Sequence, residues 1–459
     1  MLHLRHKTLA AALGAALSLG ATAQDTAPAA TELARLREAM AAMQARLQAL
    51  EAASKEASPP GMAADERHQL DRVTVKADGL EDAIEAQGLK GLKISGWIEP
   101  AYVYSSGQRR AGFQFLDSGA NGEYAIDNGA FGGLMLDFQK DFENGARLHV
   151  TLAPERGGAG IAIDGQSIVH EASVSYPLGD LQTRLLAGQI PDWSGDEALV
   201  APQNKLVTHN LLFDFTLPAG YTGAGMEFVR GAWDTKVLLA NVNASKRRPN
   251  ERAPAIALRE DWFKGEFSGF GFAGVLGKAT NFRADDVNPV TGQAYDTRDT
   301  PVHLFEMDGY FIRGDLTLTG QFGIGGQRDA AITADPSTGA LRASRWWGVT
   351  GLAAYKIAPR VELVARADFF DDRANGGGAL GYAFADGRDG LGPGPTGNPE
   401  DGANRHALSL GARLLVDANL TVKLEYRLDG ADKPVFQDVA SGGWHHANQI
   451  FASSLVMSF

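Results

Sequence analysis

Charged residues in this chain alternate with apolar residues along short segments that have the period of a β-strand. In residues 420–428 every second residue is polar or charged, Lys423 and Arg427 among them, and the residues between are Leu, Val or Tyr. Alternate residues of a strand point to opposite faces, so one face of this segment is charged and the other is apolar. Charged groups on a wet face can attract, repel and orient dissolved solutes without breaking bonds. The same pattern recurs in residues 146–152, 361–369 and 407–416.

The charged faces supply two sets of candidate lining residues. The basic candidates are Arg147, Arg184, Arg366, Arg413, Lys423 and Arg427. The acidic candidates are Glu171, Glu227, Glu362, Asp368 and Glu425. These groups either meet passing solutes or pair with one another and only solvate and stiffen a wall. The pattern leaves both interpretations open.

The sequence offers no comparable arrangement for catalysis or for a resident metal. Without Cys, the chain has no disulfide framework and no thiolate ligands. Ser and His are present but form no paired catalytic motif. Five aspartates could bind Ca²⁺, but they lack EF-hand spacing, so a solvated acidic loop is the preferred interpretation. They are Asp368, Asp371, Asp372, Asp386 and Asp389. We therefore expect no catalytic residue, no metal site and no cofactor.

The N-terminus has the features of a secretory signal peptide over residues 1–23. Arg5 and Lys7 precede a short apolar run, and residues 21–23 form an Ala-x-Ala cleavage site. The run is too short for a membrane helix of about 20 apolar residues. The net charge of −12 becomes two charges more negative on cleavage, because no acidic residue is removed. Such an acidic chain is not expected to bind nucleic acid, which requires Lys and Arg to neutralise phosphates.

Residues 24–58 are expected to form a coiled coil, and residues 59–91 a linker. Apolar residues recur at intervals of three and four, as in the seam of a heptad repeat. About three heptads are too few for a stable lone helix, so the segment needs association to form. A single amphipathic helix on another surface is the alternative. The seam residues are Leu33, Leu36, Met40, Met43, Leu47 and Leu50.

Residues 92–459 are expected to form an all-β domain of about 16 strands. Short connections rich in Gly, Asn, Asp and Pro alternate with long ones along the whole domain. A soluble sandwich has no reason to place every long loop at one end, whereas a transmembrane barrel does. The fold class is therefore an antiparallel transmembrane β-barrel. The expected strands are 92–104, 129–142, 145–153, 166–178, 181–191, 220–231, 234–244, 253–265, 267–278, 300–313, 314–326, 343–357, 360–371, 403–416, 419–430 and 447–459.

The last segment, residues 447–459, resembles the C-terminal strand of bacterial outer-membrane barrels. It ends on Phe459, and its apolar residues share one parity. A second similar stretch runs from Gly188 to Ala224, with Gly-Gln-Ile-Pro, Leu-Leu-Phe and Tyr-Thr-Gly-Ala in it. On these residues and on the loop pattern, the chain resembles Gram-negative outer-membrane porins. It is most similar to porin-like barrels with an N-terminal coiled coil after the signal peptide.

The resemblance implies a water-filled channel for passive diffusion of small hydrophilic solutes or ions. It also implies a location in the outer membrane, contact with its lipid, a coiled coil in the periplasm and a homotrimer. Phe459 would be the signal read by the barrel-assembly machinery. No enzyme activity is expected. A structural or adhesin-like barrel and an outer-membrane hydrolase stay open as alternatives.

Residues 192–219 form the third external loop, which in general porins folds into the lumen. Trp193 and Phe215 are among its apolar residues, which an exposed loop would not need. Its first part carries acids at Asp192, Asp196 and Glu197. We expect this acidic loop to face a basic wall, best supplied by Arg147, Arg184 and Arg366. The alternative is an external lid packed on the rim of the barrel.

Overall fold

The fold is described for the part of the chain that the computed structural model places. It comprises residue 76 and residues 89–459, except for residues 108, 116–132, 154–167, 200, 245–248, 250, 253, 282, 381–391 and 395–396. The barrel unit comprises Leu89–Phe459, and Met1–Gly88 forms a separate unit. The expected signal peptide and coiled-coil seam lie outside the described residues. Among the described residues, no helix is long and apolar enough to span a membrane.

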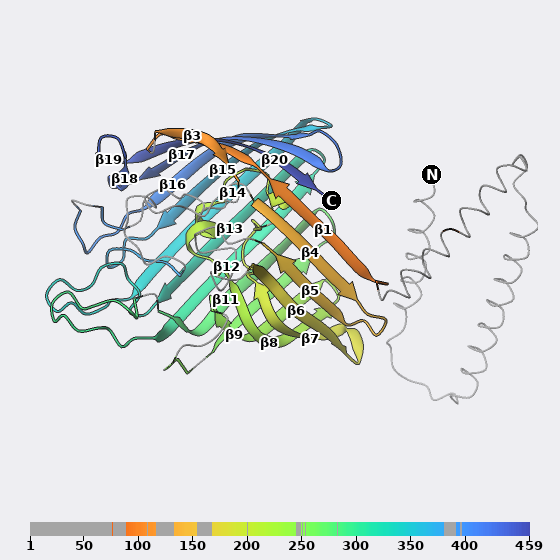
Figure 1. Cartoon of the computed structure of the whole chain (residues 1–459), viewed down its shortest axis with the longest axis horizontal. Helices are drawn as coiled ribbons and strands as arrows, with labels where there is room; N and C mark the ends of the chain where they lie inside the picture. Colours follow the sequence, from red (N-terminus) through yellow and green to blue (C-terminus); the bar gives the residue numbers. More distant parts are fainter. Residues whose placement is uncertain are drawn as a thin grey trace, which may run out of the picture. The chain divides into compact units, whose positions relative to one another are not determined.

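Nearly all regular structure in the described residues is antiparallel β-sheet (Figure 1). Two short helical elements, η1 (Ala201–Gln203) and α4 (Leu211–Phe215), lie in the connection 192–219. The strands are β1 (Leu92–Glu99), β2 (Ala101–Ser105), β3 (Arg110–Gln114), β4 (Gly133–Asp141), β5 (Arg147–Leu152), β6 (Val169–Leu178), β7 (Asp180–Pro191), β8 (Gly220–Arg230), β9 (Trp233–Val242), β10 (Ala255–Phe263), β11 (Ser268–Thr280), β12 (Asp299–Arg313), β13 (Leu316–Gln327), β14 (Ser344–Ala358), β15 (Val361–Asp371), β16 (Arg405–Leu415), β17 (Leu420–Ala431), β18 (Phe436–Gln437), β19 (Trp444–His445) and β20 (Ala447–Ser458).

The sheet closes on itself, because β20 pairs with β17 on one side and with β1 and β2 on the other. Pro100 has no backbone N–H and separates β1 from β2 within the first barrel strand. β3 pairs with β2 and β4 pairs with β1, so these four segments supply two positions around a barrel of 16 strands. Phe459 ends the closing seam: its N–H donates to Gly96 O at 3.0 Å, and Gly96 N–H donates to Phe459 O at 3.1 Å. Closure removes the two free edges that an open sheet would have, although among the described residues β3 pairs with β2 alone.

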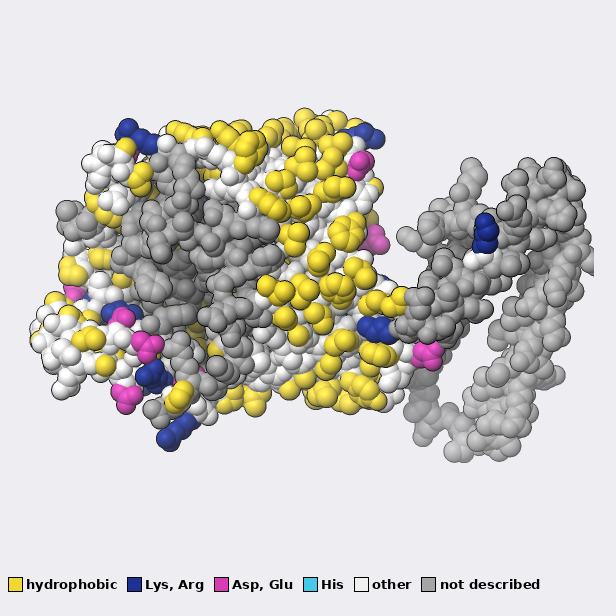
Figure 2. Space-filling model, viewed as in Figure 1, with side chains coloured by type: hydrophobic (Ala, Val, Ile, Leu, Met, Phe, Trp, Pro, Cys, Tyr) yellow, Lys and Arg dark blue, Asp and Glu magenta, His cyan; other side chains and the backbone are white. Residues whose placement is uncertain are grey.

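The two faces of the barrel have opposite chemistry. On β17, Leu424 and Tyr426 are exposed on the outside, and Glu425 and Arg427 are buried inside. Hydrophobic side chains gather on the outer surface of β1 and β4 to β7, and charged side chains lie near the ends of the strands on this view (Figure 2). This reversal of a soluble protein's pattern is expected when the outer face meets lipid and the inner face meets water.

The predicted barrel is confirmed, and each predicted segment contains one barrel strand with ends that differ by a few residues. Two additions lie in segments expected to be loops. β3 has weak strand residues, Arg-Ala-Gly-Phe-Gln, and forms because β2 offers a pairing edge. The β18–β19 hairpin lies in the last long connection. β3 thus depends on a tertiary pairing that its own sequence does not encode.

Candidate functional site

The connection 192–219 between β7 and β8 lies inside the barrel and contacts inner-face residues of strands on different sides. Near its start, Gly195 N–H donates to Glu306 of β12 at 2.7 Å. Further along, Val207 N–H and Thr208 N–H donate to Glu425 of β17 at 2.9 and 2.8 Å. Glu306 and Glu425 lie near the middle of their strands. The segment therefore crosses the interior at mid-height, and we call it the lumen loop.

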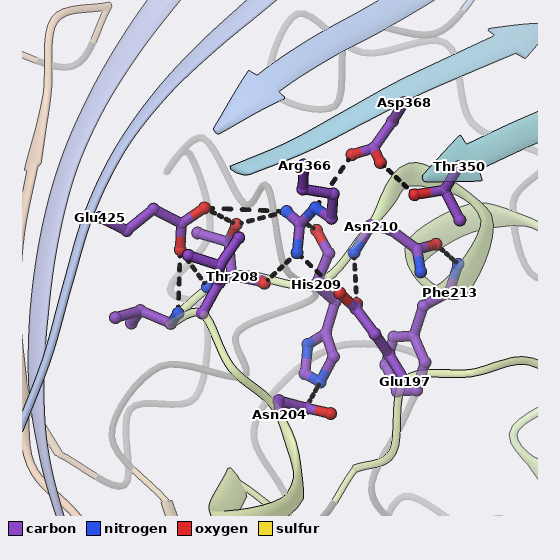
Figure 3. A network of polar contacts seen from close by, with 12 residues as sticks. Glu197, Asn204, Thr208, His209, Asn210, Phe213, Thr350, Arg366, Asp368 and Glu425 are labelled. Atoms are coloured by element: carbon purple, nitrogen blue, oxygen red, sulfur yellow. Dashed lines mark hydrogen bonds and ion pairs between the residues drawn. The ribbon is translucent and has the colours of Figure 1, made fainter. Parts of the chain in front are cut away.

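Arg366 of β15 is the centre of the polar contacts that hold the lumen loop (Figure 3). Its guanidinium donates to the Glu197 carboxylate at 2.7 Å, to Thr208 O at 2.7 Å and to His209 O at 2.8 Å. The Asp368 carboxylate lies 3.3 Å from Nε. Arg366 is 1% exposed, and a planar guanidinium can satisfy several acceptors at once in such a place. One wall residue thus joins two separate parts of the loop.

Two neighbouring strand residues complete this anchor. Arg427 of β17 donates to Thr208 Oγ1 at 3.0 Å and to His209 O at 2.7 Å. The Glu425 carboxylate accepts from the Thr208 hydroxyl at 2.7 Å. Buried charges are costly unless they are paired and hydrogen-bonded, so the contacts must form together. Arg366, Glu425, Arg427, Glu197 and Thr208 are called the polar anchor below.

The second half of the loop is anchored by apolar packing. Helix α4 begins after Asn210, whose side chain accepts from Phe213 N–H at 2.8 Å as an N-cap. Leu211 and Leu212 are fully buried among inner-face residues of the strands, and Phe215 stacks on Phe370 of β15 with ring centroids 5.9 Å apart. A core of this kind inside the barrel wall keeps the loop in place independently of the ion pairs.

The first turn of the loop depends on Asp192 and Gly195. The Asp192 carboxylate accepts from Ser194 N–H at 3.0 Å and from the hydroxyl of Tyr221, the second residue of β8. Gly195 has φ +87°, and a Cβ there would lie 2.9 Å from Leu217 Cδ1. A residue with a side chain would be strained at this position. The next residue, Asp196, has its hydrogen-bond partner Thr319 on β13 and not in the polar anchor.

Asp196 is the exposed member of the three loop acids. Its carboxyl reaches water, but the loop and the facing wall enclose it. This desolvation raises the pKa of Asp196 to about 6, and the nearby Glu197 carboxylate adds to the rise, whereas a hydrogen bond with Thr319 of β13 opposes it. Asp196 therefore changes its charge near pH 6.

The basic wall is only partly as expected. Arg366 does meet a loop acid, Glu197. Arg147 instead contacts Asp141 at 2.8 Å, and Arg184 donates to Gly145 O at 2.7 Å. Both lie at the short-turn end of the barrel, below the lumen loop, so the expectation that they oppose its acids was wrong. Strand parity had placed them on the inner face but could not give their height.

The other basic candidates differ in their surroundings. Arg413 keeps 30% of its side chain exposed and lies 3.9 Å from Glu362. Lys423 is 1% exposed, lies 3.6 Å from Glu99 and donates to Leu206 O at 3.3 Å. Arg427 belongs to the polar anchor. Mutual pairing, one of the two interpretations left open by the sequence, thus describes Arg366, Lys423 and Arg427.

Several inner-face residues were not singled out from the sequence. His149 lies between Asp137 of β4 and Glu171 of β6, with Nδ1 3.0 Å from the Glu171 carboxylate. Arg259 of β10 pairs with Asp308 of β12. Parity along β4, β10 and β12 places Asp137, Arg259 and Asp308 on the inner face, so the sequence could have identified them as lining residues. Their pairing across strands did not follow from it.

The aspartates after residue 367 do not form a common site. Asp368 contacts Arg366 and Thr350, Asp371 pairs with Arg373 at 3.1 Å, and the carboxylate of Asp372 accepts from Gly378 N–H at 2.7 Å. Asp368 and Asp372 are buried, which corrects the expectation of a solvated loop for these two. Asp386 and Asp389 lie outside the described residues. In the described part of the chain, no cluster of His, Asp and Glu could hold a metal ion.

Solved structures similar to this chain are outer-membrane proteins. OmpT of Vibrio cholerae, expressed in the outer membrane, is 11% identical with a TM-score of 0.49, covering 80% of this chain and 97% of its own. An anion-selective porin from Comamonas acidovorans is 9% identical with a TM-score of 0.48, covering 80% and 99%. OmpF of Salmonella typhi is 10% identical with a TM-score of 0.48, covering 80% and 97%.

The family assignment comes from sequence. No curated protein matches the chain. Residues 4–250 match a family model described as "Protein of unknown function (DUF3138)". Because this match covers more than half of the chain, the protein belongs to the DUF3138 family.

Proposed function

We propose that this protein forms a water-filled channel in the outer membrane for passive diffusion of small hydrophilic solutes or ions. The observation that carries the proposal is wet, charged surface inside the barrel. On the wall formed by β4 to β9, the side chains of Asp137, His149 and Lys236 are 28%, 28% and 24% exposed although they point inward. The polar anchor holds the lumen loop to β15 and β17, and these three side chains on β4, β5 and β9 still reach water beside it.

Planar-bilayer recording of the purified protein tests this function. A channel gives stepwise, ohmic conductance that scales with the conductivity of the salt. A structural or adhesin-like barrel, or a hydrolase, gives no conductance across the bilayer, and that result would exclude the channel. Fractionation of cells adds a second check, because the protein should be recovered with outer membranes and should migrate differently on gels before and after heating.

Asp196 should make ion selectivity depend on pH. With a pKa raised to about 6, its carboxyl is neutral below that pH and negative above it. We expect cation preference, measured as a reversal potential in a salt gradient, to increase from pH 5 to pH 7. Asp196→Asn should remove most of this increase. Burial raises the pKa of Asp192 to about 7, so its carboxyl stays mostly neutral below pH 7 and Asp192→Asn should change the increase less. Glu197→Gln should also change it less, because Arg366 holds that carboxylate.

Asp335 supplies the matched control for this measurement. It lies in the connection between β13 and β14, where hydrogen bonds from Ser337 and Thr338 lower the pKa of its carboxyl far below that of Asp196. Its charge is constant between pH 5 and pH 7, so Asp335→Asn should leave the pH dependence intact. A pH dependence that persists in Asp196→Asn would assign the titration to another group.

The assembly is proposed to be a homotrimer held in part by a periplasmic three-stranded coiled coil of residues 24–58. Leu36→Asp, Met43→Asp and Leu50→Asp together should weaken the oligomer, measured by cross-linking, because charges in the seam prevent packing. The barrel should stay folded. Ala41→Asp, Ala45→Asp and Ala52→Asp add the same charge outside the seam and should leave assembly unchanged. A monomer before any substitution would contradict the proposal.

Membrane insertion is proposed to use the barrel-assembly machinery, with Phe459 as part of the recognised strand. The backbone of Phe459 completes the closing seam with Gly96, and its ring is 67% exposed on the outside. The apolar outer face then contacts outer-membrane lipid. In this orientation the short turns face the periplasm and the long connections face outward.

A further inference from the structure

The outer face of the barrel carries three basic side chains around a glycine at the long-loop end of β12 to β14. Gly326 of β13 pairs with His303 of β12 on one side and with Arg345 of β14 on the other. Arg328, two residues beyond Gly326, extends the same outward row, and its N–H donates to Pro301 O at 2.9 Å. His303, Arg328 and Arg345 are all exposed. They are called the rim triad below.

The absence of a side chain at Gly326 lets the three basic side chains of the rim triad come together. Across a sheet, directly paired and diagonal residues have Cβ atoms within about 8 Å of one another, so the triad surrounds the position where Gly326 has no side chain. The imidazole of His303 fills the space above Gly326, since Cε1 and Nε2 would lie 3.0 and 3.4 Å from a Cβ there. A small anion held between His303, Arg328 and Arg345 would meet donors on three sides.

The two arginines have no acidic ion-pair partner in the described part of the chain. Neither Arg328 nor Arg345 forms an ion pair with a described residue, whereas the neighbouring Arg373 pairs with Asp371 at 3.1 Å. The acidic groups nearby are Asp329, next to Arg328 in sequence, and Asp371. On the outward positions at the same end of β7, β8 and β9, the described residues are uncharged, namely Gln189, Thr222 and Asn241.

An apolar surface lies directly beside the triad, toward the middle of the strands. Phe305, Ile324 and Trp347 lie on the outer face, two residues closer to the middle of their strands than His303, Gly326 and Arg345. They are 46%, 45% and 39% exposed. Trp347 packs on Phe369 of β15 with ring centroids 5.2 Å apart. Aromatic side chains at this depth are typical of the membrane–water interface. The surface thus offers donors for an anion and, next to them, a support for acyl chains.

We propose that the rim triad and its apolar surface bind the phosphorylated, multiply acylated glycolipid of the outer leaflet, with one lipid A phosphate held between His303, Arg328 and Arg345. Arginine recognises phosphate through two parallel N–H donors, and such charge-assisted bonds are stronger than neutral ones. The acyl chains lie along Phe305, Ile324 and Trp347. This inference goes beyond the channel and rests only on the proposed outer-membrane location and orientation.

Binding of purified lipid A to the detergent-solubilised protein, followed by native mass spectrometry, tests the proposal. The bisphosphorylated lipid should bind, and its dephosphorylated form should bind roughly tenfold more weakly or worse. Arg328→Gln with Arg345→Gln should weaken binding of the bisphosphorylated lipid to the same extent. Equal binding of the two lipids, or an unaffected double variant, would overturn the proposal.

A charge-matched control uses Arg313→Gln with Arg360→Gln. These arginines lie at the short-turn end of β12 and just before β15, so the change in net charge is the same but the rim triad is intact. This control should bind lipid A as the native protein does. Phosphatidylglycerol that binds as tightly as lipid A would show recognition of any anionic lipid and would also reject the proposal.

Lipid binding and channel activity are separable in these variants. Arg328 and Arg345 are on the outside of the barrel, so their double variant should keep the native single-channel conductance. Lipid A binding without conductance would reject the proposed channel but support the proposed lipid site. Conductance without preferential binding of lipid A would support the channel but reject the lipid site.

Discussion

Replacing residues 194–208 with a short Gly-Ser linker should raise the single-channel conductance severalfold. These residues run from the Ser194–Gly195 turn to the Thr208 contact with Arg366, so their removal clears protein from the mid-height of the lumen. The wall charges that the loop had covered, Glu425 and Arg427, become solvated instead of buried, so the barrel does not keep unpaired buried charge. Planar-bilayer recording at fixed salt measures the change.

The barrel itself should survive this replacement. Its strands are joined by main-chain ladders that the loop does not supply, and heat-modifiable migration reports whether it is folded. Deleting residues 289–292, an exposed tip of the connection between β11 and β12, is the control and should leave conductance unchanged. A folded variant without residues 194–208 that conducts like the native protein would place the conduction path away from the lumen loop.

Arg366→Met should loosen the lumen loop without opening the barrel. Met keeps most of the buried stem but removes the charge, which leaves the carboxylates of Glu197, Asp368 and Glu425 with less compensation in a buried place. Removing one partner of a buried ion pair costs about 3–5 kcal/mol. Because each 1.4 kcal/mol is a factor of ten, local opening of the loop should increase on the order of a hundredfold or more.

The absence of Cys makes this opening measurable with one introduced thiol. Val207→Cys places the thiol at a position that is 7% exposed in the closed loop, and its reaction with a small maleimide reports how often the loop opens. Labelling should accelerate strongly in the Arg366→Met background. Equal labelling rates in the two backgrounds would show that α4 and its apolar packing hold the loop alone.

Arg413→Met is the matched control, since Arg413 also points inward but is 30% exposed and 3.9 Å from its acidic partner. Glu362 is buried but keeps Lys205 as a partner at 2.7 Å, so the loss of a distant, partly exposed Arg413 costs little and labelling should stay near the native rate. Glu197→Gln added to Arg366→Met should recover part of the lost loop stability, because it removes one of the uncompensated carboxylates. That recovery would identify the ion pair, and not the shape of Arg366, as the cause.

Strand number, strand position and the assignment of faces followed from the sequence alone. A strand repeats every two residues, so lipid outside and water inside impose an alternation that is visible in segments such as 420–428 without any neighbour. Gly, Asn and Asp at the short turns gave the hairpin connections, and the length of the others gave the two ends of the barrel. β3 was not predicted, because its residues have weak strand propensity and it forms through pairing with β2.

The contacts inside the barrel were decided by the tertiary structure. Parity gives the face of Arg147, Arg184 and Arg366 but not their height, and only Arg366 lies at the level of the lumen loop. Its partners, Glu197 and Glu425, come from the loop and from β17, far from it in sequence. Such pairings depend on barrel closure and on the path of one loop across it. The sequence contains the charges of the site, and the closed sheet determines which of them meet.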